Sequence, residues 1–348
     1  MLDIDGSDGG GQIVRSSLAL SMLTDTPVRI ENVRGNRPDP GLKHQHRGAV
    51  ELAAEVGDAD VTGAELGATT LTFDPGDVSG GNYETTIGTA GSITLVFDTV
   101  LPLATVIDEP LSVTVGGGTD VKWSPSLDYY RRVKLPFLRQ CGLQAVIDPA
   151  RRGFYPTGGG RARLRTAPST LAPIRATDRG ERRHIRIYSV ASEHLDDADV
   201  APRQARTVAQ ELPTEASVTE RVSTVATTDS PGSAIVVAAT YENGCGGFTA
   251  FGERGKPAEE VGSDAAASLR QFDRSGAAID EHLADQLLLP MAIGGGRISI
   301  PRVTDHVESS VELLEQFGIE CRVDDVGAST IVSIDEPISG QNKTGSRR

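Results

Sequence analysis

Cysteine is scarce in this chain of 348 residues, and long apolar runs are absent. The three cysteines, Cys141, Cys245 and Cys321, are far apart without a CxxC spacing, which argues against a disulfide framework and a zinc site. No apolar run approaches about 18 residues, and no charged-then-apolar leader follows Met1. We therefore expect no membrane span and no signal peptide, and we predict a cytoplasmic protein.

Lysine is scarce as well. Only five of the 34 basic residues are lysines, and the net charge is −14. An acidic, lysine-poor composition is typical of proteins adapted to high salt, which we take as a hypothesis about habitat. It also argues against broad nucleic-acid binding, because phosphate contacts need basic side chains. Any such binding should be local, through clustered arginines.

Three segments share one pattern: an apolar helix, a strand, a second helix closing on glycine, and two short strands. The pattern predicts helices at 13–23, 45–56, 92–103, 127–140 and 280–292 and one that contains residue 306, with strands at 28–33, 111–115, 297–300, 319–323 and 330–334 and near 61, 71, 145 and 162. Between the second and third segments it predicts strands at 184–190, 217–225 and 234–241 and helices at 200–212 and 257–272.

The glycines that close the second helices, Gly57, Gly142 and Gly318, are unevenly spaced, and the second interval is about 91 residues longer than the first. An inserted domain accounts for the excess. We predict an α/β (α+β) fold in which three repeated two-helix, four-stranded units form one domain from 1–182 and 277–339. A small α/β domain is inserted at 183–276, and 340–348 is expected to be a disordered tail.

Residues 5–15 form a glycine loop that leads into a helix. Glycines let backbone N–H groups close on phosphate oxygens, Arg15 can add bidentate contacts, and Asp8 can hold a divalent cation. Glycine-rich turns are common, so alone this loop indicates a phosphate site only weakly.

Residues 34–47 are the most basic stretch of an acidic chain. Cationic and titratable side chains surround two prolines, which suits a polyanion, and Gln45 and His46 lead into the next helix. The alternative is a solvated loop.

Three further stretches are candidate ligand sites, each with a plain structural alternative. After the glycines of 116–118, Pro125 and Tyr129 are placed where flat apolar faces can sandwich a base, although core aromatics after a turn would look the same. In a later helix Asp285 lies one turn from His282, so the two can meet one ligand or only cap the helix. Residues 153–160 form another glycine loop, which either lines a phosphate channel or turns a hairpin.

His306 lies in the opening turn of the helix that ends at Gly318, with Thr304 or Asp305 as the cap. The electropositive first turn disfavours an imidazolium, and the neutral ring keeps a lone pair that can attack phosphorus. A solvent-facing or capping histidine is the plainer interpretation of this residue alone.

Together these stretches resemble the RNA 3′-terminal phosphate cyclase family. The resemblance extends over nearly the whole chain and rests on motifs that occur in the family's order: the glycine loop at 5–15, the basic segment 34–46, and 89–92, 117–120, 153–160, 251–255, 282–287 and the helix of His306. It implies three repeated α/β units with a small α/β domain inserted before the last.

The resemblance also implies an ATP- and Mg²⁺-dependent ligase that makes a 2′,3′-cyclic phosphate at an RNA 3′ end, through histidine-AMP and RNA-pp-A intermediates. His306 would be the adenylated nucleophile, with a catalytic and RNA-end cluster of Arg34, Arg37, Gln45 and His46. The nucleotide residues would be Asp8 (also the metal ligand), Gln12, Arg15, Pro125, Tyr129, His282, Asp285 and Gln286. The chain departs from the family pattern at Asp8, where glutamate is usual, and at Asp98, where glutamine is common.

Two alternatives stay open at this stage. Cyclase-like proteins of pre-rRNA processing share the fold and bind RNA without catalysis, but they lack the adenylated histidine that His306 supplies. Enolpyruvyl transferases use a similar repeated unit but do not account for the arginine-rich segment. The sequence leaves the natural RNA substrates and a homodimer open.

Overall fold

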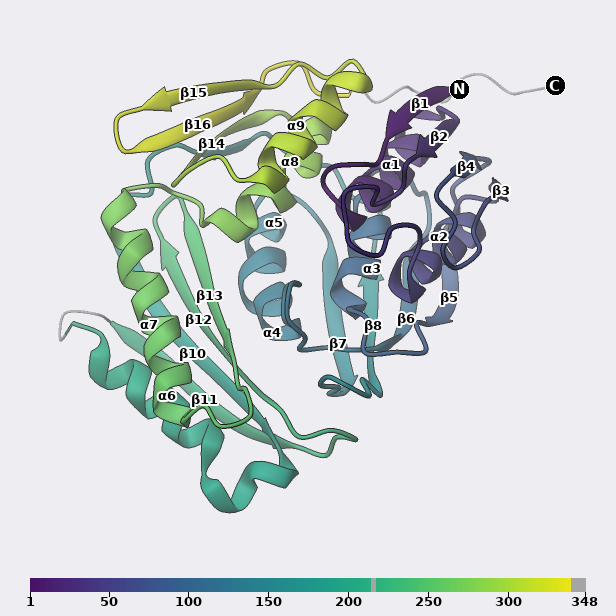
Figure 1. The fold of residues 1–348 in the computed structure, drawn as a ribbon. Helices are drawn as coiled ribbons and strands as arrows, with labels where there is room; N and C mark the ends of the chain where they lie inside the picture. The colour runs from purple at the N-terminus through teal and green to yellow at the C-terminus, as the bar shows by residue number, and fades with distance from the viewer. Residues whose placement is uncertain (214–216, 339–348) are drawn as a thin grey trace.

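The computed structural model describes residues 1–213 and 217–338. Its secondary structure forms four four-stranded sheets, each with helices, and the predicted α/β class is confirmed (Figure 1). In this part of the chain no helix is both long and apolar enough to cross a membrane. The predicted tail at 340–348 lies outside the described residues.

The first unit has the chain order β-α-β-α-β-β, and its strands lie in the order β1-β2-β4-β3. Only β1 and β2 are parallel. The elements are β1 Leu2–Asp5, α1 Gly11–Thr24, β2 Val28–Glu31, α2 His44–Val56, β3 Asp60–Thr62 and β4 Leu71–Asp74.

The second unit repeats this topology in the sheet β5-β6-β8-β7. The predicted helix at 127–140 is one helical run that contains a π-helical turn, Tyr130–Lys134. The elements are β5 Gly81–Thr86, α3 Ile93–Val100 with a 3-10 turn Leu101–Thr105, β6 Leu111–Gly117, α4 Leu127–Tyr129, α5 Leu135–Gln140, β7 Ala145–Arg151 and β8 Gly160–Thr166.

The third unit has the same strand order, β9-β14-β16-β15, but its first strand stands apart in sequence. Strand β9 pairs in parallel with β14, so the insertion interrupts the third unit and does not precede it, which corrects the expectation. The elements are β9 Ile174–Ala176, α8 Glu281–Gly294, β14 Gly296–Ile300, α9 Asp305–Gln316, β15 Arg322–Val326 and β16 Ser329–Ile334.

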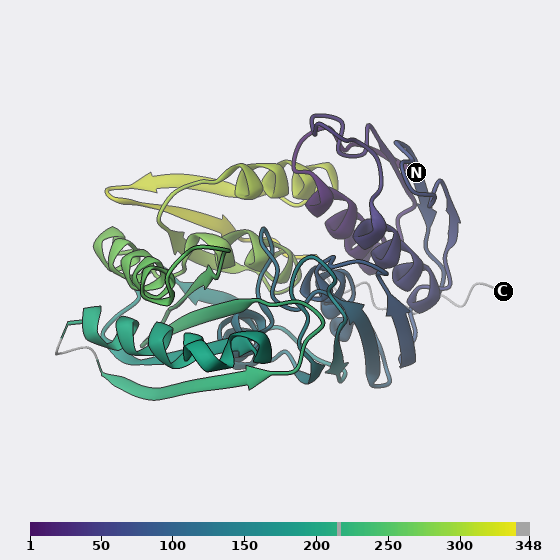
Figure 2. The ribbon, with the colours of Figure 1, turned by 60° about the horizontal axis from the view of Figure 1, so that its bottom comes forward.

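The intervening unit has its own sheet, β11-β10-β12-β13, and its own apolar core. Helices α6 and α7 cover one face of this sheet, and the other face is turned toward α4 and α5 (Figures 1 and 2). The elements are β10 Arg182–Ser192, α6 Val200–Glu211, β11 Val218–Ala226, β12 Ser233–Tyr241, β13 Cys245–Phe251 and α7 Ala258–Ser275. The domain boundaries drawn from the sequence stay a prediction.

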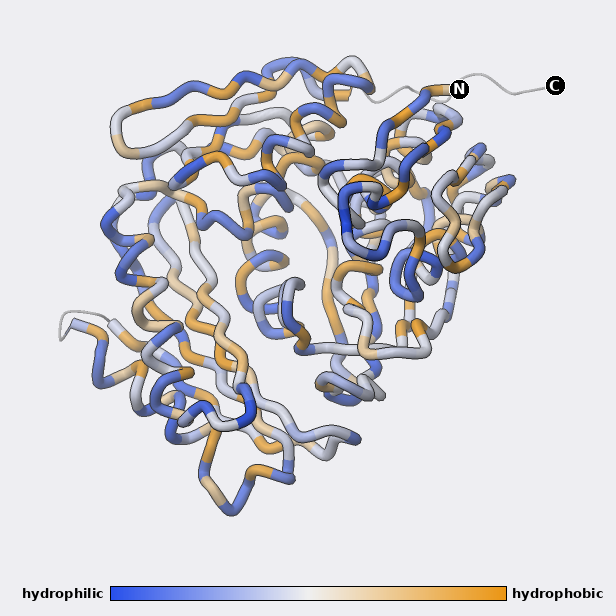
Figure 3. Tube along the Cα trace, viewed as in Figure 1, coloured by the Kyte–Doolittle hydropathy of each residue, from blue (hydrophilic) through white to orange (hydrophobic). Residues whose placement is uncertain are grey.

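The three repeated units share one apolar core, which explains why they stack: a single unit would leave one face of its helices and sheet in water. Hydrophobic residues follow the strands and inward helix faces, whereas the loop that leads into α2 is largely hydrophilic (Figure 3). The polar loops at the helix N-termini are therefore not part of the apolar core, and their side chains are available to bind a ligand.

Candidate active site

The first turns of α1 and α9 meet, although they come from opposite ends of the chain. Gln12 Nε2 donates to the carbonyl oxygen of His306 at 3.3 Å and also to Ser310 Oγ. Thr304 caps α9 by accepting from the Val307 N–H at 3.3 Å. First-turn N–H groups have no partner inside a helix, so two adjacent N-termini make a site suited to an anion.

His306 is the second residue of α9, and its side chain is exposed. Partial desolvation and the positive charges of Arg15 and Arg37 lower its pKa below the usual histidine value, and Asp305 opposes the shift only weakly. The imidazole is therefore neutral at neutral pH and keeps one nitrogen lone pair for attack. The sequence predicted a lowered pKa from the helix N-terminus, and the structure adds desolvation and two neighbouring arginines as causes.

His46 is buried against the glycine loop. A Cβ at Gly11 would overlap His46 Nε2, so only glycine leaves room for the ring. Burial, followed by the charges of Arg15, Arg34 and Lys43, lowers the pKa of His46 to about 3. The Lys43 N–H donates to His46 Nδ1 at 3.1 Å, which leaves the proton of the neutral ring on Nε2, facing the loop.

The two predicted arginines of the basic segment have different surroundings. Arg34 Nη1 donates to the carbonyl oxygens of Asp39 and Gly41 at 2.9 and 3.0 Å, so this guanidinium holds the loop itself. Arg37 is exposed, and a Cβ at Gly10 would lie 3.3 Å from its Nη2. Arg37 therefore covers the start of α1, where an anion would bind.

Gln45 connects this cluster to the second unit. Its Oε1 accepts from the Ser92 N–H at 2.8 Å, and a Cβ at Gly91 would lie 3.1 Å from the Gln45 Cβ. The structure thus brings His306, Arg37, His46 and Gln45 to the loops around the N-terminus of α1.

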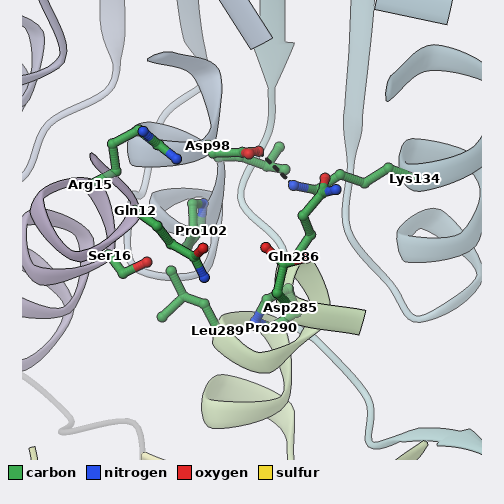
Figure 4. Close-up of a pocket in the computed structure, with 11 residues that line it drawn as sticks. Gln12, Arg15, Ser16, Asp98, Pro102, Lys134, Asp285, Gln286, Leu289 and Pro290 are labelled. Carbon is green, nitrogen blue, oxygen red and sulfur yellow. Dashed lines mark hydrogen bonds and ion pairs between the residues drawn. The ribbon is translucent and has the colours of Figure 1, made fainter. Parts of the chain in front are cut away.

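A pocket that is partly open to solvent lies between α1, α3 and α8 (Figure 4). Four predicted nucleotide residues line it: Gln12, Arg15, Asp285 and Gln286. Asp98, which departs from the family pattern, also lines it. The other lining residues were not predicted from the sequence: Ser16, Leu101, Pro102, Lys134, Leu289 and Pro290. Gln12 lines the cavity and donates to the main-chain oxygen of His306, whereas the imidazole of His306 does not itself line the cavity.

The cavity wall is strongly charged. Lys134 Nζ lies 2.5 Å from Asp98 Oδ1, which also accepts from the Tyr130 hydroxyl at 2.7 Å. Burial raises the pKa of Asp285 to about 7, with Lys134 opposing and Asp98 adding to the shift. Asp285 therefore holds its proton for much of the time near neutral pH and can donate a hydrogen bond.

One side-chain atom of Gln286 in the cavity wall is a buried hydrogen-bond acceptor without a donor among the described residues. Its Oε1 is buried and has no hydrogen-bond partner among the described residues, while its Nε2 donates to the carbonyl oxygen of His282. A buried acceptor without a donor is costly, so a hydroxyl or amino group of a ligand would satisfy it.

Tyr129 does not line the cavity, which corrects the expectation that its ring forms an open face for a base. It is 2 % exposed, and a Cβ at Gly247 would overlap its ring, so neither face of the ring is open to a base. Its hydroxyl donates to the buried Asp280 at 3.1 and 3.2 Å. Asp280 also accepts from the Gly247 N–H at 3.0 Å, so it joins the second, third and inserted units.

Pro125 and His282 lie at neighbouring helix starts without lining the cavity. The Pro125 carbonyl oxygen accepts from Thr94 Oγ1 at 2.7 Å, and the His282 N–H donates to Asp280 at 2.9 Å. The contact between Tyr129 and Asp280 holds these two helix starts together. His282 is exposed and close enough to His306 to contribute to the lowering of its pKa.

Asp8 lies apart from the other predicted nucleotide residues, in a second pocket that Asp5, Ser309 and Glu312 also line. Its Oδ1 accepts from Asn36 Nδ2 at 2.7 Å. No group of three or more His, Cys, Asp or Glu in residues 1–213 and 217–338 could hold a metal ion. Because Mg²⁺ is commonly held by one or two carboxylates and substrate phosphates, Asp8 fits a Mg²⁺–phosphate complex but not a metal bound by protein alone.

The chain is similar to known proteins over nearly its whole length. The family described as "RNA 3'-terminal phosphate cyclase" matches residues 7–323. A protein of that name from Halobacterium salinarum is 42% identical over 340 residues, covering 94% of this chain and 98% of the relative. Its namesakes from Methanopyrus kandleri and Pyrococcus furiosus are both 41% identical, each covering 91% of this chain and 93% of the relative.

Proposed function

Because the chain belongs to the RNA 3′-terminal phosphate cyclase family, we propose that it is a ligase-class enzyme that uses ATP to convert an RNA 3′-terminal phosphate into a 2′,3′-cyclic phosphate. One observation carries the proposal: the exposed His306 has a lowered pKa, and its main-chain oxygen accepts from Gln12, which lines a cavity with convergent polar groups. We also propose that the protein acts in the cytoplasm, as predicted from the sequence.

The first step stores AMP on the protein. A neutral His306 nitrogen attacks the α-phosphorus of ATP, a P–N bond forms, and pyrophosphate leaves. The first-turn N–H groups of α1 and α9, with Arg15 and Arg37, would stabilise the negative charge on the phosphate oxygens.

The second and third steps use the RNA. An oxygen of the RNA 3′-phosphate attacks the same phosphorus and releases His306, which gives an RNA-pp-A anhydride. The neighbouring 2′-hydroxyl then attacks the 3′-phosphorus and expels AMP. Arg37 and the Nε2–H of His46 would bind the 3′-phosphate, with Arg34 and Gln45 fixing their loops.

ATP would occupy the cavity and its rim. Gln12 and Arg15 would contact the phosphates, the orphan Oε1 of Gln286 would accept from a ribose hydroxyl, and a protonated Asp285 would donate to the nucleotide. Pro125 and His282 would enclose the adenine, and Tyr129 would not contact it because its ring is buried. Asp8 would hold Mg²⁺, which supplies charge neutralisation at the phosphates.

An assay with RNA that carries a 3′-phosphate tests the overall reaction. With ATP and Mg²⁺ in molar salt, the RNA end should become resistant to phosphatase while AMP and pyrophosphate form. A protein that binds the RNA but leaves its end unchanged would instead be a non-catalytic cyclase-like protein.

A further inference from the structure

Two aromatic side chains are strongly exposed. Trp123, the only tryptophan of the chain, is 96% exposed and Tyr155 is 75% exposed. In contrast, Tyr129 and Tyr130 are buried, and the other large apolar side chains exposed among the described residues are aliphatic. A lone exposed apolar side chain needs no special role, but large rings exposed together on neighbouring loops indicate a binding surface.

The loops that carry these rings are held together. The Thr119 N–H donates to the Gly153 carbonyl oxygen at 2.9 Å, and the backbones of Asp120 and Phe154 form an isolated parallel β-bridge. Arg152 adds two ion pairs beneath them, to Asp120 at 3.0 Å and to Asp128 at 2.5 Å. Both rings therefore stand on one braced pair of loops.

An ion pair joins the same loops to the inserted unit. Lys122 Nζ lies 2.9 Å from Glu253 Oε1, and both side chains are about half exposed. This ion pair places the exposed Arg254 next to the loop of Trp123. We call Lys122, Trp123, Tyr155 and Arg254 the junction surface, since they lie where the second unit meets the inserted unit.

The ends of β7–β8 and β11–β12 lie next to each other at this junction (Figure 1). Arg151 Nη2 lies 2.6 Å from Asp229 Oδ1, and the Thr157 N–H donates to Ser230 Oγ at 3.2 Å. These contacts between units fix the junction surface as a preformed feature.

The junction surface is continuous with the catalytic cluster. A Cβ at Gly158 would lie 2.9 Å from the Cα of Ala90, so the loop of Tyr155 packs on the loop 88–92. That loop in turn donates from Ser92 to Gln45, beside His46. A strand whose 3′ end lies at His46 can thus continue over 88–92 onto the aromatic rings.

We propose that the junction surface binds the single-stranded RNA segment upstream of the phosphorylated 3′ end, with bases stacked on Trp123 and Tyr155 and phosphates near Lys122 and Arg254. The inference rests on the proposed function. Exposed rings favour single strands, since a duplex hides the faces of its bases, and stacking tolerates any sequence. Stacking also suits an acidic chain, in which few cations can contribute.

Tryptophan fluorescence tests binding without any catalysis, because Trp123 is the only tryptophan. Unphosphorylated single-stranded RNA of about ten nucleotides should quench the emission of both wild type and His306→Ala, and the duplex of the same sequence should not. Arg254→Gln should lower the slope of log affinity against log salt by about 0.7. Unquenched emission at saturating RNA would overturn the inference even if the enzyme cyclises RNA.

Kinetics separates the surface from the catalytic site. Trp123→Ala with Tyr155→Ala should raise KM for 3′-phosphorylated RNA of that length about tenfold or more, with kcat, KM for ATP and cyclisation of a 3′-phosphorylated dinucleotide unchanged. Val326→Ala, at an exposed apolar position in β15, is the control. An unchanged KM for the long RNA, or a raised KM for ATP instead, would contradict the inference. If the wild type does not cyclise RNA but its tryptophan emission is quenched by RNA, only the proposed function is contradicted.

Discussion

Gln12 Nε2 lies 3.3 Å from the carbonyl oxygen of His306, across a separation of 294 residues. This contact ties the first turn of the first unit's helix to the first turn of the last unit's helix. Neither unit alone could form the candidate site: the first supplies the glycine loop and the α1 side of the cavity, and the third supplies the α8 side of the cavity and the imidazole of His306.

Arg37 should control the pH at which His306 becomes reactive. Its charge lowers the pKa of His306, and the neutral form is the nucleophile, so adenylation is retained above that pKa and lost as pH falls through it. In Arg37→Gln the pKa should rise, and the acidic limb of adenylation without RNA should move up by roughly half a pH unit.

The control for this experiment is Arg165→Gln, which removes an exposed arginine paired with Asp148. Its profile should match the wild type. Coincident profiles for all three proteins would show that Arg37 does not act on the imidazole.

Gly11 should be required for the position of His46. In Gly11→Ala the new Cβ would overlap His46 Nε2, and cyclisation should fall about 100-fold because a catalytic group is displaced by about 1 Å. Gly48→Ala is a matched control, since its Cβ would meet no atom closer than 3.8 Å and alanine should stabilise α2 by about 0.5–1 kcal/mol. Equal activities of the two variants would be inconsistent with the packing of His46 on the loop.

Tyr129 should matter for stability and not for ATP. Tyr129→Phe removes one of the donors to the buried Asp280 and should cost about 1–2 kcal/mol in urea unfolding, with ATP-dependent labelling retained. Tyr83→Phe, which removes an exposed hydroxyl bonded to Ser79, should cost less than about 0.5 kcal/mol. A large rise in KM for ATP in Tyr129→Phe would return this ring to the nucleotide site.

Asp285 should make stability depend on pH. Its pKa is raised from 3.8 to about 7, so between these values the folded chain keeps a proton that the unfolded chain has released. The resulting stabilisation is present below the unfolded value and is lost as pH rises through about 7. The free energy of unfolding of the wild type should therefore fall relative to Asp285→Asn over this range, and parallel curves would contradict the raised pKa.

The sequence predicted most helices and the repeated pattern because apolar periodicity and closing glycines are local signals. It did not assign β1, β5, β9 or β13. Strand β5 is GNYETT with no buried residue, β9 has only three residues, and β13 begins with a cysteine and two glycines. Such short or weakly apolar strands exist because a neighbouring strand pairs with them, and the parallel partner of β9 is more than a hundred residues away.

Contacts between residues far apart in the sequence also limit how much of the candidate site could be predicted. Its loops could be recognised from glycines and arginines, but Lys134 and Asp280 could not, because each acts through a distant partner: Asp98 for Lys134, and Tyr129 for Asp280. The hydroxyl of Tyr129 gave no local sign that it would point into the core.

Labelling with ATP that carries a radioactive α-phosphate tests the central claim most directly. The wild type, incubated with Mg²⁺ in molar salt, should gain an acid-labile label that is lost on addition of RNA with a 3′-phosphate. His306→Ala should reduce the labelling at least about 1,000-fold while keeping the fold and the binding of ATP. Undiminished labelling of a folded His306→Ala protein would contradict the account.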